Sequence, residues 1–449
     1  MEHSGKRKNS SLLRLRLRGV LLIAVLLFSL GGRAMASGTE AAKVQLEYLC
    51  SWMSLAAYND RLGTLAREEL ASSGWLIERV QSYGAKADAK YLIARRKEMQ
   101  EKPLYLVTVT GTESRGDLRS DAGFARCYFA GASPEEFAEM AAKPDTAESE
   151  PLVHRGFNSY TQQAFFQPEE DGLSVGERLR DLMIDNPEVR VCLTGHSLGG
   201  AVATLLGQRL LDMGAPAEQL RVVTFGAPPV GNKAFAEHAA SLQLDRVVIS
   251  SDPVVRLLAL GPKLEHAGTE TKLERSSNSK RFHHAMMSYL DATLKNYYDA
   301  VPEGQGMPEW MQPEALLTQP VYLVQRVELT ELIEDDVPYL KRASAEYVGR
   351  QFAEVVQGEW AGYREAMRQA KKAGCSYVLM QEYSSQRRKD KDYEFSVVLN
   401  ETIYDVEGNL LASQSFTTGT RDLPPVFAAL YNAVQGREAR EQAVAGLKK

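Results

Sequence analysis

One segment of the chain constrains its fold more than any other. Residues 189–206 consist of an apolar run, the turn Gly195-His-Ser-Leu-Gly199 and a second apolar run, with no break between them. This order predicts a buried strand, a sharp turn and a helix, the setting in which a G-x-S-x-G motif presents its serine as a nucleophile. Such a turn is strained, and glycines at 195 and 199 remove the side chains that would collide there. Ser197 is therefore the predicted nucleophile.

The helix that follows this turn has a predicted chemical role of its own. Gly200 and Ala201 are small enough to let the helix approach the sheet closely. Its N-terminus leaves backbone N–H groups unpaired and carries partial positive charge, so it stabilises negative charge that develops beside the serine. We expect the N–H of Leu198 to be the first donor to such an oxyanion.

Helical and strand patterns alternate around this segment. Ser174-Val-Gly-Glu177 has the spacing of a capping box and opens a predicted helix at 178–184. Strands separated by helices form parallel sheets, so the region is predicted to be an α/β domain. The remaining predicted elements are a helix over 41–59, paired strands at 91–95 and 104–110, loops and short helices over 113–150, strands at 189–194, 221–225 and 246–250, and helices at 201–213 and through 236–240.

The N-terminus has the composition of a secretory signal peptide. Residues 1–36 hold seven basic residues and one acidic residue, and an apolar run at 20–30 precedes the small-residue sequence Ala34-Met-Ala36. The apolar run is shorter than the ~20 residues that span a bilayer, which favours cleavage over a membrane anchor. We therefore expect an exported protein, periplasmic or secreted, that begins near Ser37.

The predicted mature chain is acidic. Loss of residues 1–36 changes the formal net charge from −5 to −11, because that segment carries six more positive than negative charges. We expect no nucleic acid partner and no general attraction to anionic lipid surfaces. The four cysteines lack the close spacing of a metal site, and export permits a disulfide without requiring one. Buried thiols are the alternative state of Cys50, Cys127, Cys192 and Cys375.

Four stretches of the sequence resemble one family. Gly195-His-Ser-Leu-Gly-Gly200, Thr224-Phe-Gly-Ala-Pro-Pro-Val-Gly-Asn232, Val107-Thr-Val-Thr-Gly-Thr-Glu-Ser114 and Val153-His-Arg-Gly-Phe157 are similar to landmarks of the fungal-type, or class 3, triacylglycerol lipases, and the resemblance covers roughly residues 42–297. It implies an α/β-hydrolase fold with a mostly parallel sheet. It also implies hydrolysis of a lipid or other ester substrate by a Ser-His-Asp triad, without cofactor or metal and with transient contact to a membrane or lipid surface.

A triad needs an acid and a base downstream of Ser197, in that order along the chain. Asp252 follows the predicted strand 246–250, at the carboxyl end where open α/β sheets place their active sites, whereas Asp245 lies at the other end of that strand. The segment Ser251-Asp-Pro-Val-Val-Arg-Leu257 also resembles the acid segment of the family. Asp252 is therefore the predicted acid, and an Asp-Pro turn in a loop is the alternative interpretation.

Four histidines lie downstream of the serine, and the resemblance selects one of them. Only His284 has the family's spacing to a following Tyr289-Leu290 pair, so His284 is the predicted base and His283 the alternative. His238 on a predicted helix and His266 in a polar loop are expected to be solvated.

The loop after the predicted strand 104–110 both follows and departs from the family. The resemblance assigns the backbone N–H of Thr112 as the second oxyanion donor, with a plain turn residue as the alternative. Thr110 stands where the family usually has arginine, so the charge support of the loop differs while the donor remains. A lid has room within 113–150, but residues 113–121 are mostly charged, and activation at an oil interface is therefore not expected. His196, beside the serine, is expected to be structural.

Residues 301–320 contain four prolines and two glycines and are predicted to link the domain at 37–300 to a smaller α+β domain at 321–449. That second domain shows no nucleophile, metal spacing or phosphate loop, so we expect an accessory role in binding or assembly, or simply stabilisation. It faintly resembles the small α+β domains of periplasmic assembly and secretion lipoproteins. The resemblance implies docking to an envelope protein, with residues 386–391 as the candidate contact.

Three functional hypotheses follow from these motifs. In the first, the domain at 37–300 is a hydrolase that transfers an acyl group from an ester to water. In the second, it is a weakly active or inactive binding module, and the C-terminal domain serves envelope assembly. In the third, the acyl group passes to an alcohol or amine acceptor. The complete set of motifs favours the first.

Overall fold

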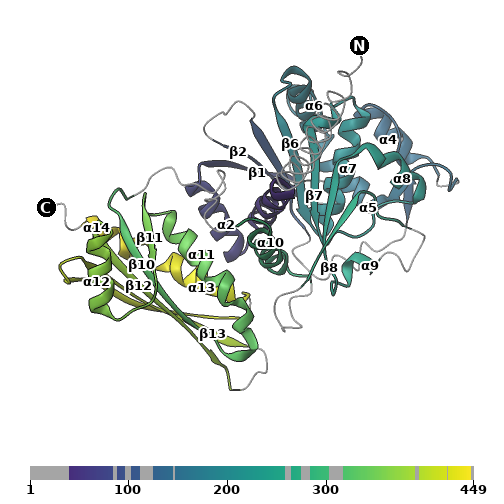
Figure 1. Ribbon diagram of the computed structural model, residues 1–449. Coiled ribbons are helices and arrows are strands. Elements are labelled where there is room, and N and C mark those ends of the chain that lie inside the picture. Colours follow the sequence, from purple (N-terminus) through teal and green to yellow (C-terminus); the bar gives the residue numbers. More distant parts are fainter. Residues whose placement is uncertain are drawn as a thin grey trace, which may run out of the picture.

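Two large sheets, each with its own helices, make up the described part of the chain (Figure 1). The computed structural model describes residues 40–83, 88–96, 103–111, 125–144, 147–257, 264–274, 284–302, 317–389, 394–421 and 423–445. The predicted signal peptide at 1–36 lies outside these residues, as does most of the predicted linker at 301–320. Both boundaries therefore stay predictions. No helix in the described ranges combines the length and apolar character that crossing a membrane requires.

The N-terminal part, residues 40–302, is built on a seven-stranded sheet in the order β1-β2-β3-β6-β7-β8-β9. Its first three strands pair antiparallel with one another, and every pair from β3 to β9 is parallel, so the predicted mostly parallel α/β-hydrolase sheet is confirmed. The strands are β1 (Trp75–Tyr83), β2 (Asp88–Arg96), β3 (Leu104–Val109), β6 (Arg190–His196), β7 (Leu220–Phe225), β8 (Leu244–Ile249) and β9 (Thr269–Leu273).

Helices cover both faces of this sheet. Along β6, Val191 and Leu193 join the apolar cluster on one face, whereas Cys192 joins the cluster on the other. The first face packs against α5 (Arg155–Phe165), α6 (Val175–Asp185), α7 (Leu198–Asp212) and α8 (Lys233–His238). The helix at 40–56 and α10 (Met286–Ala300) pack on the second face. Strand β6 is thus buried from both sides, as its apolar sequence predicts.

Local sequence explains where helix α6 begins. The Ser174 side chain accepts a hydrogen bond from the N–H of Glu177, and the Glu177 carboxylate accepts one from the N–H of Ser174, so the predicted capping box opens α6. The smaller elements are α2 (Arg61–Ser72), β4 (Arg126–Tyr128), α4 (Pro134–Ala142), β5 (Leu152–His154), α9 (Val254–Leu257) and the 3₁₀ turns Ala217–Gln219 and Ala239–Ser241. The region 113–150 therefore contains a helix and a short strand in its described residues.

The C-terminal part, residues 317–445, contains a five-stranded sheet in the order β11-β10-β12-β13-β14. Strand β10 is parallel to β11 and β12, and β12 to β14 form an antiparallel meander, which confirms the predicted α+β character. The predicted contact segment 386–391 begins at the end of β12 and continues into residues outside the described ones. The elements are β10 (Val321–Glu328), a 3₁₀ segment (Glu331–Asp336), α11 (Val337–Gly349), β11 (Val355–Gly358), α12 (Tyr363–Lys372), β12 (Tyr377–Arg387), β13 (Phe395–Asp405), β14 (Leu410–Gly419), α13 (Pro425–Gln435) and α14 (Arg437–Ala445).

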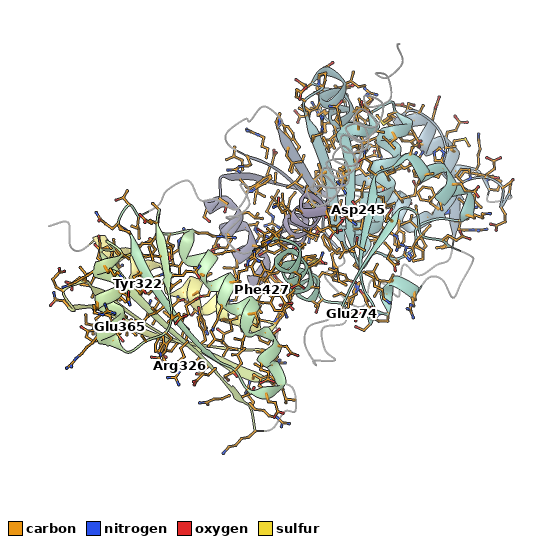
Figure 2. The ribbon with its side chains drawn as sticks, viewed as in Figure 1. Asp245, Glu274, Tyr322, Arg326, Glu365 and Phe427 are labelled. Atoms are coloured by element: carbon orange, nitrogen blue, oxygen red, sulfur yellow. The ribbon has the colours of Figure 1, made fainter. Side chains whose placement is uncertain are left out.

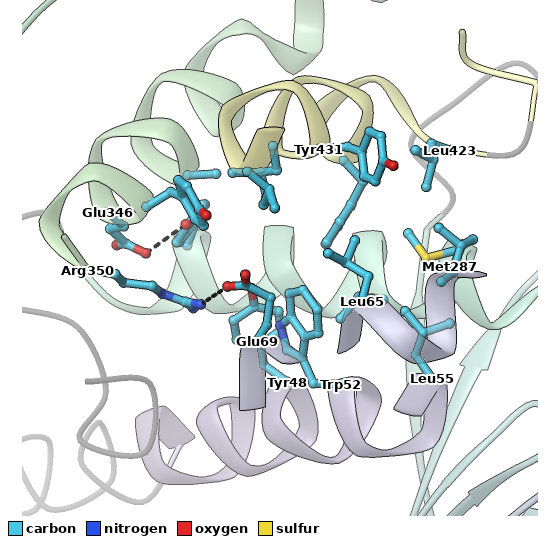
Figure 3. Close-up of a pocket in the computed structure, with 18 residues that line it drawn as sticks. Tyr48, Trp52, Leu55, Leu65, Glu69, Met287, Glu346, Arg350, Leu423 and Tyr431 are labelled. Atoms are coloured by element: carbon cyan, nitrogen blue, oxygen red, sulfur yellow. Dashed lines mark hydrogen bonds and ion pairs between the residues drawn. The ribbon is translucent and has the colours of Figure 1, made fainter. Parts of the chain in front are cut away.

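The two parts share one apolar core. Phe427 of α13 lies between them (Figure 2) and packs edge-on against Trp52 of the helix at 40–56, with ring centroids 5.9 Å apart. Lys295 of α10 forms a buried ion pair with Asp336, and the two side-chain atoms are 2.5 Å apart. A small cavity of about 40 Å³ remains at this junction, with the ion pair between Arg350 and Glu69 at its edge (Figure 3). The junction is therefore apolar at its centre and held by ion pairs around it.

Candidate active site

Ser197 occupies the turn between β6 and α7. Its φ of 58° and ψ of −125° make it the single non-glycine residue with positive φ in the described part of the chain. A Cβ at Gly195 would lie 2.4 Å from the backbone of Gly199, and a Cβ at Gly199 would lie 2.2 Å from the carbonyl oxygen of Val109. Both glycines are thus required by close backbone contacts, and the strain of the turn is concentrated at the serine.

The structure brings the three predicted triad residues into contact. His284 Nε2 lies 2.7 Å from Ser197 Oγ, and His284 Nδ1 lies 2.7 Å from Asp252 Oδ2. Asp252 follows β8 at the carboxyl edge of the sheet, and His284 lies two residues before the first residue of α10. Because a carboxylate only accepts hydrogen bonds, His284 carries a proton on Nδ1 and presents Nε2 as the acceptor for the serine hydroxyl.

Two further donors hold the carboxylate of Asp252, whose side chain is fully buried. The hydroxyl of Tyr289 donates to Oδ2 at 2.6 Å, and the N–H of Val254 donates to Oδ1 at 2.9 Å. Gly226 adopts a φ of 56° beside them, and a Cβ there would lie 2.7 Å from both Asp252 Oδ2 and the Tyr289 hydroxyl. The acid is therefore oriented by its surroundings before any substrate arrives.

Burial raises the pKa of Tyr289 well above its ordinary value, and the charge of Asp252 adds to the effect. The phenol thus stays protonated and remains a donor at every ordinary pH. The sequence analysis used Tyr289 only to select His284 by the spacing between the two residues. Its place among the apolar residues of α10 is the feature that indicates a buried side chain.

A second hydrogen-bonded pair lies behind the imidazole of His284. The ring of His196 is buried, and its centroid lies 4.6 Å from that of His284. His196 Nδ1 lies 2.6 Å from the hydroxyl of Tyr58, just after the helix at 40–56. Burial, and secondarily the proximity of His284, hold the pKa of His196 well below its ordinary value. His196 is therefore neutral, and Tyr58 is a site residue that the sequence did not reveal.

Of the two predicted oxyanion donors, the structure describes one, Leu198. Leu198 is the first residue of α7, so its N–H is among those that have no acceptor within the helix. Thr112 lies outside the described residues, but Gly111 before it is described. A Cβ at Gly111 would lie 2.5 Å from the Tyr58 hydroxyl and 2.6 Å from the carbonyl oxygen of His196. The chain that leads to Thr112 therefore passes directly beside the serine turn.

The acid and the two histidines that the sequence analysis did not assign to the triad make contacts outside it. Asp245 pairs with Arg221 at 2.7 Å, at the start of β8. His238 is exposed, and its Nε2 lies 2.9 Å from a carboxylate oxygen of Asp212. His266 is half-buried, and its Nε2 lies 3.0 Å from the carbonyl oxygen of Val255. Burial lowers the pKa of His266, so the expectation of a solvated role holds for His238 and is wrong for His266.

Two more sequence predictions concern residues near the site. The buried hydroxyl of Thr110, at the position where the family has arginine, donates to the carbonyl oxygen of Ala57 at 3.3 Å. Thr110 thus ties the end of β3 to the end of the helix at 40–56. His283 lies outside the described residues. Within the described ranges, no three His, Cys, Asp or Glu side chains are grouped as metal ligands.

Comparison with known proteins points to one family. Residues 106–261, which include Ser197 and Asp252, match the family model described as Lipase (class 3). The chain is 31% identical over 104 residues to the secreted mono- and diacylglycerol lipase A of Penicillium camembertii, covering 23% of this chain and 33% of that protein. It is 33% identical over 153 residues to phospholipase A1-II 1 of Oryza sativa subsp. japonica, covering 30% and 37% respectively.

Among solved structures, a mutant of the protein named MDLA from Penicillium cyclopium aligns with 22% identity and a TM-score of 0.39, over 52% of this chain and 81% of that one. The chain spans about a third of the length of the curated relatives it matches. The family match and the sequence relatives agree on the same class of enzyme. Residues 106–261 of this chain are therefore similar to the class 3 lipase family.

Proposed function

We propose that this protein is an exported serine esterase that hydrolyses carboxylic esters of lipids with Ser197 as nucleophile, His284 as base and Asp252 as the orienting acid. The observation that carries the proposal is the continuous chain of contacts from Ser197 Oγ through both ring nitrogens of His284 to Asp252, each 2.7 Å long. A hydroxyl is activated when an oriented imidazole accepts its proton, and this chain supplies both the acceptor and its orientation.

Acylation uses these groups in one sequence. Ser197 Oγ attacks the carbonyl carbon of the ester while its proton passes to His284 Nε2, and the carbonyl oxygen becomes an oxyanion. The N–H of Leu198 stabilises that charge, with the N–H of Thr112 as the proposed second donor. When the bond to the leaving alcohol breaks, His284 returns the proton to the alcohol oxygen, and the acyl group remains on Ser197.

Deacylation repeats the steps with water as the nucleophile. His284 Nε2 takes a proton from water as its oxygen attacks the acyl carbon, and the second oxyanion forms at the same place. Collapse of this intermediate breaks the bond to Ser197 Oγ, which recovers its proton from His284. The products are a carboxylic acid and the free enzyme. Asp252 accepts the hydrogen bond from His284 Nδ1 and stabilises the imidazolium that forms twice in the cycle.

The names of the relatives support a lipid ester as substrate. One is named a mono- and diacylglycerol lipase and another a phospholipase A1, and both names refer to acyl lipids. The Penicillium camembertii relative is named as secreted, which agrees with the export predicted from residues 1–36. We propose transient contact with a lipid surface during turnover, and docking of the C-terminal part to an envelope protein as a separate role.

The test is hydrolysis of nitrophenyl esters with short and long acyl chains, and of a phospholipid, by the protein from Ser37 onward. Ser197→Ala removes the nucleophile, and Ser241→Ala, at an exposed serine in a surface turn, is the matched control. We expect Ser197→Ala to lose at least about 1,000-fold in kcat and the control to keep full activity. Wild-type protein without activity on any of the esters would refute the proposal.

One alternative predicts a different outcome in a simple experiment. If the N-terminal part is a binding module without catalysis, a serine-directed phosphonate will not label the chain. We expect labelling at Ser197, because a phosphonate needs only the serine and its base to react. Transfer of the acyl group to an alcohol or amine acceptor is distinguished by adding the acceptor and measuring the ester or amide formed beside the free acid.

A further inference from the structure

Two cysteine sulfurs lie in contact beneath the active-site strand. Cys50 on the helix at 40–56 and Cys192 on β6 have their Sγ atoms 3.5 Å apart, and both side chains are buried. The two residues are 142 positions apart in the sequence, so this contact is a product of the fold. Cys127 and Cys375 lie in two other hydrophobic clusters. The proposed hydrolysis has no use for either thiol of the contacting pair.

The backbone holds the two sulfurs at this separation. Ser54 Oγ and Thr194 Oγ1 are 3.2 Å apart, four residues further along the helix and two residues further along the strand. Four helical residues advance about 6 Å and two strand residues about 6.6 Å, so the helix runs alongside β6 and both pairs are in register. The Cys50 and Cys192 side chains are therefore presented to each other by two regular elements.

We propose that Cys50 and Cys192 form an intramolecular disulfide when this chain folds in an oxidising compartment. Bonded sulfurs lie about 2.05 Å apart, so the two Sγ atoms must approach by about 1.5 Å. Rotation about the Cα–Cβ bonds of the two cysteines, together with adjustment of the backbone while the core forms, would bring the sulfurs to this distance. The proposal goes beyond the proposed esterase function and does not depend on it.

The oxidant is the disulfide of a thiol–disulfide exchange partner, such as an exported oxidase or oxidised glutathione. One thiolate of the pair attacks a sulfur of that disulfide, which forms a mixed disulfide and releases one thiolate of the oxidant. The second thiolate then attacks the mixed disulfide, forms the Cys50–Cys192 bond and releases the other. Two thiol protons are lost and two electrons pass to the oxidant, whose disulfide is reduced to two thiols.

The bond has to form before the core closes. Burial raises the pKa of the Cys50 thiol well above its ordinary value, and the neighbouring Cys192 adds to the effect, so Cys50 holds almost no thiolate in the folded protein. Exchange therefore takes place during folding, when both thiols still reach the oxidant. Once formed, the bond is shielded from reductants by the same burial, which is the property of a structural rather than a regulatory disulfide.

The test counts thiols in full-length protein that has folded in an oxidising compartment. The protein is denatured without reductant, alkylated and weighed by intact mass spectrometry, and then reduced and alkylated again. We expect two alkylated thiols before reduction and four after it. A non-reducing digest should yield one linked peptide pair that contains Cys50 and Cys192. Protein refolded from the reduced, denatured state in a glutathione redox buffer should give the same count.

Four single variants identify the partners. Cys50→Ala and Cys192→Ala should each show three thiols both before and after reduction, whereas Cys127→Ala and Cys375→Ala should each show one before and three after. The oxidised wild type should melt about 5 °C or more above its reduced form, because the bond closes a long loop. Four thiols in the unreduced wild type, or a linked peptide with Cys127 or Cys375, would overturn the proposal even if no variant folds.

Discussion

The hydroxyl of Tyr289 and the ring of His284 share one oxygen of Asp252, at 2.6 and 2.7 Å respectively. Oδ2 of Asp252 thus accepts a hydrogen bond from the neutral Tyr289 hydroxyl and also orients the ring of His284. Because Tyr289 lies on the helix that His284 precedes, one element sets the positions of both groups relative to the carboxylate. Tyr289 is therefore a positioning residue for the proposed reaction, and it acts through Asp252 rather than on the substrate.

Removal of this hydroxyl should slow the chemical step. A hydrogen bond to a charged group is worth about 1.5–3 kcal/mol, so Tyr289→Phe should lower kcat about 10- to 100-fold while KM changes less than about threefold. The control is Tyr297→Phe, which removes the hydroxyl of a buried tyrosine further along α10. Equal losses of kcat in the two variants would show that the effect is one of stability, and would exclude a positioning role.

The contact between Tyr58 and Gly111 predicts that the loop beside the serine tolerates no side chain. Gly111→Ala would place a Cβ 2.5 Å from the Tyr58 hydroxyl and 2.6 Å from the carbonyl oxygen of His196, so the chain leading to Thr112 must shift. We expect kcat to fall about 100- to 1,000-fold, the loss that follows when an oxyanion donor is displaced. Gly362→Ala, where a Cβ meets open space, should leave kcat unchanged. Full activity in Gly111→Ala would place the oxyanion donor elsewhere.

Glu47 predicts a pH dependence of stability. Burial raises its pKa to about 7, the charges of Asp245 and Glu40 add to the rise, and Lys43 and the hydroxyl of Thr271 oppose it. A carboxyl whose pKa is higher in the folded state binds more protons there than when unfolded. Its contribution to stability is therefore complete below pH 4.5 and is lost as the pH rises to about 7.

Glu47→Gln removes this titration. Between about pH 5 and pH 8, the free energy of unfolding of the variant should fall less than that of the wild type, by on the order of 1–3 kcal/mol. Urea unfolding at the two pH values measures the difference, with Glu68→Gln, at an exposed carboxyl on α2, as the control. Parallel pH profiles for the wild type and Glu47→Gln would contradict the prediction.

The buried ion pair in the C-terminal part predicts an asymmetry between single and double substitutions. Arg440 donates to both carboxylate oxygens of Glu401, at 2.9 and 2.8 Å, and neither side chain is exposed to solvent. Arg440→Met leaves a buried carboxylate without its partner and should cost about 3–5 kcal/mol. Arg440→Met combined with Glu401→Gln should cost clearly less, because no uncompensated charge remains.

Urea denaturation measures both variants. Arg368→Met, at an exposed arginine paired with Glu365, is the control and should leave the midpoint unchanged. A double variant no more stable than Arg440→Met would show that the arginine contributes through its packing against Tyr347, over whose ring it lies, rather than through its charge.

Local signals in the sequence predicted part of the fold. The strand, turn and helix around Ser197, the capping box of α6 and the alternation that gives a parallel sheet all depend on residues within a few positions of one another. These features are confirmed because short-range pattern and long-range packing agree there. The strands β1, β9 and β11 and the helices α2, α5 and α10 were not predicted. In β1, the charged pair at 78–79 interrupts the apolar pattern, and α2 packs against the C-terminal part, a contact that local sequence does not encode.

The candidate site divides in the same way. Ser197, Asp252 and His284 were predicted from motif, chain order and family spacing, and the structure places them in contact. The pairing of Tyr58 with His196 joins residues 138 positions apart, and no local pattern around Tyr58 indicates it. Likewise, the contact of Cys50 with Cys192 follows from the register of a helix on a strand, which the sequence determines only through the complete fold.

The apolar core shared by the two parts of the chain limits how the protein can be divided. Trp52, Tyr298 and Met287 would be newly exposed if the chain ended at residue 302, and Lys295 would lose its partner Asp336. An apolar patch of this kind favours association between molecules. A protein that ended at residue 302 would therefore precipitate or dimerise through that patch. The second sheet and its helices thus cover this patch permanently and protect the part that holds Ser197 from self-association.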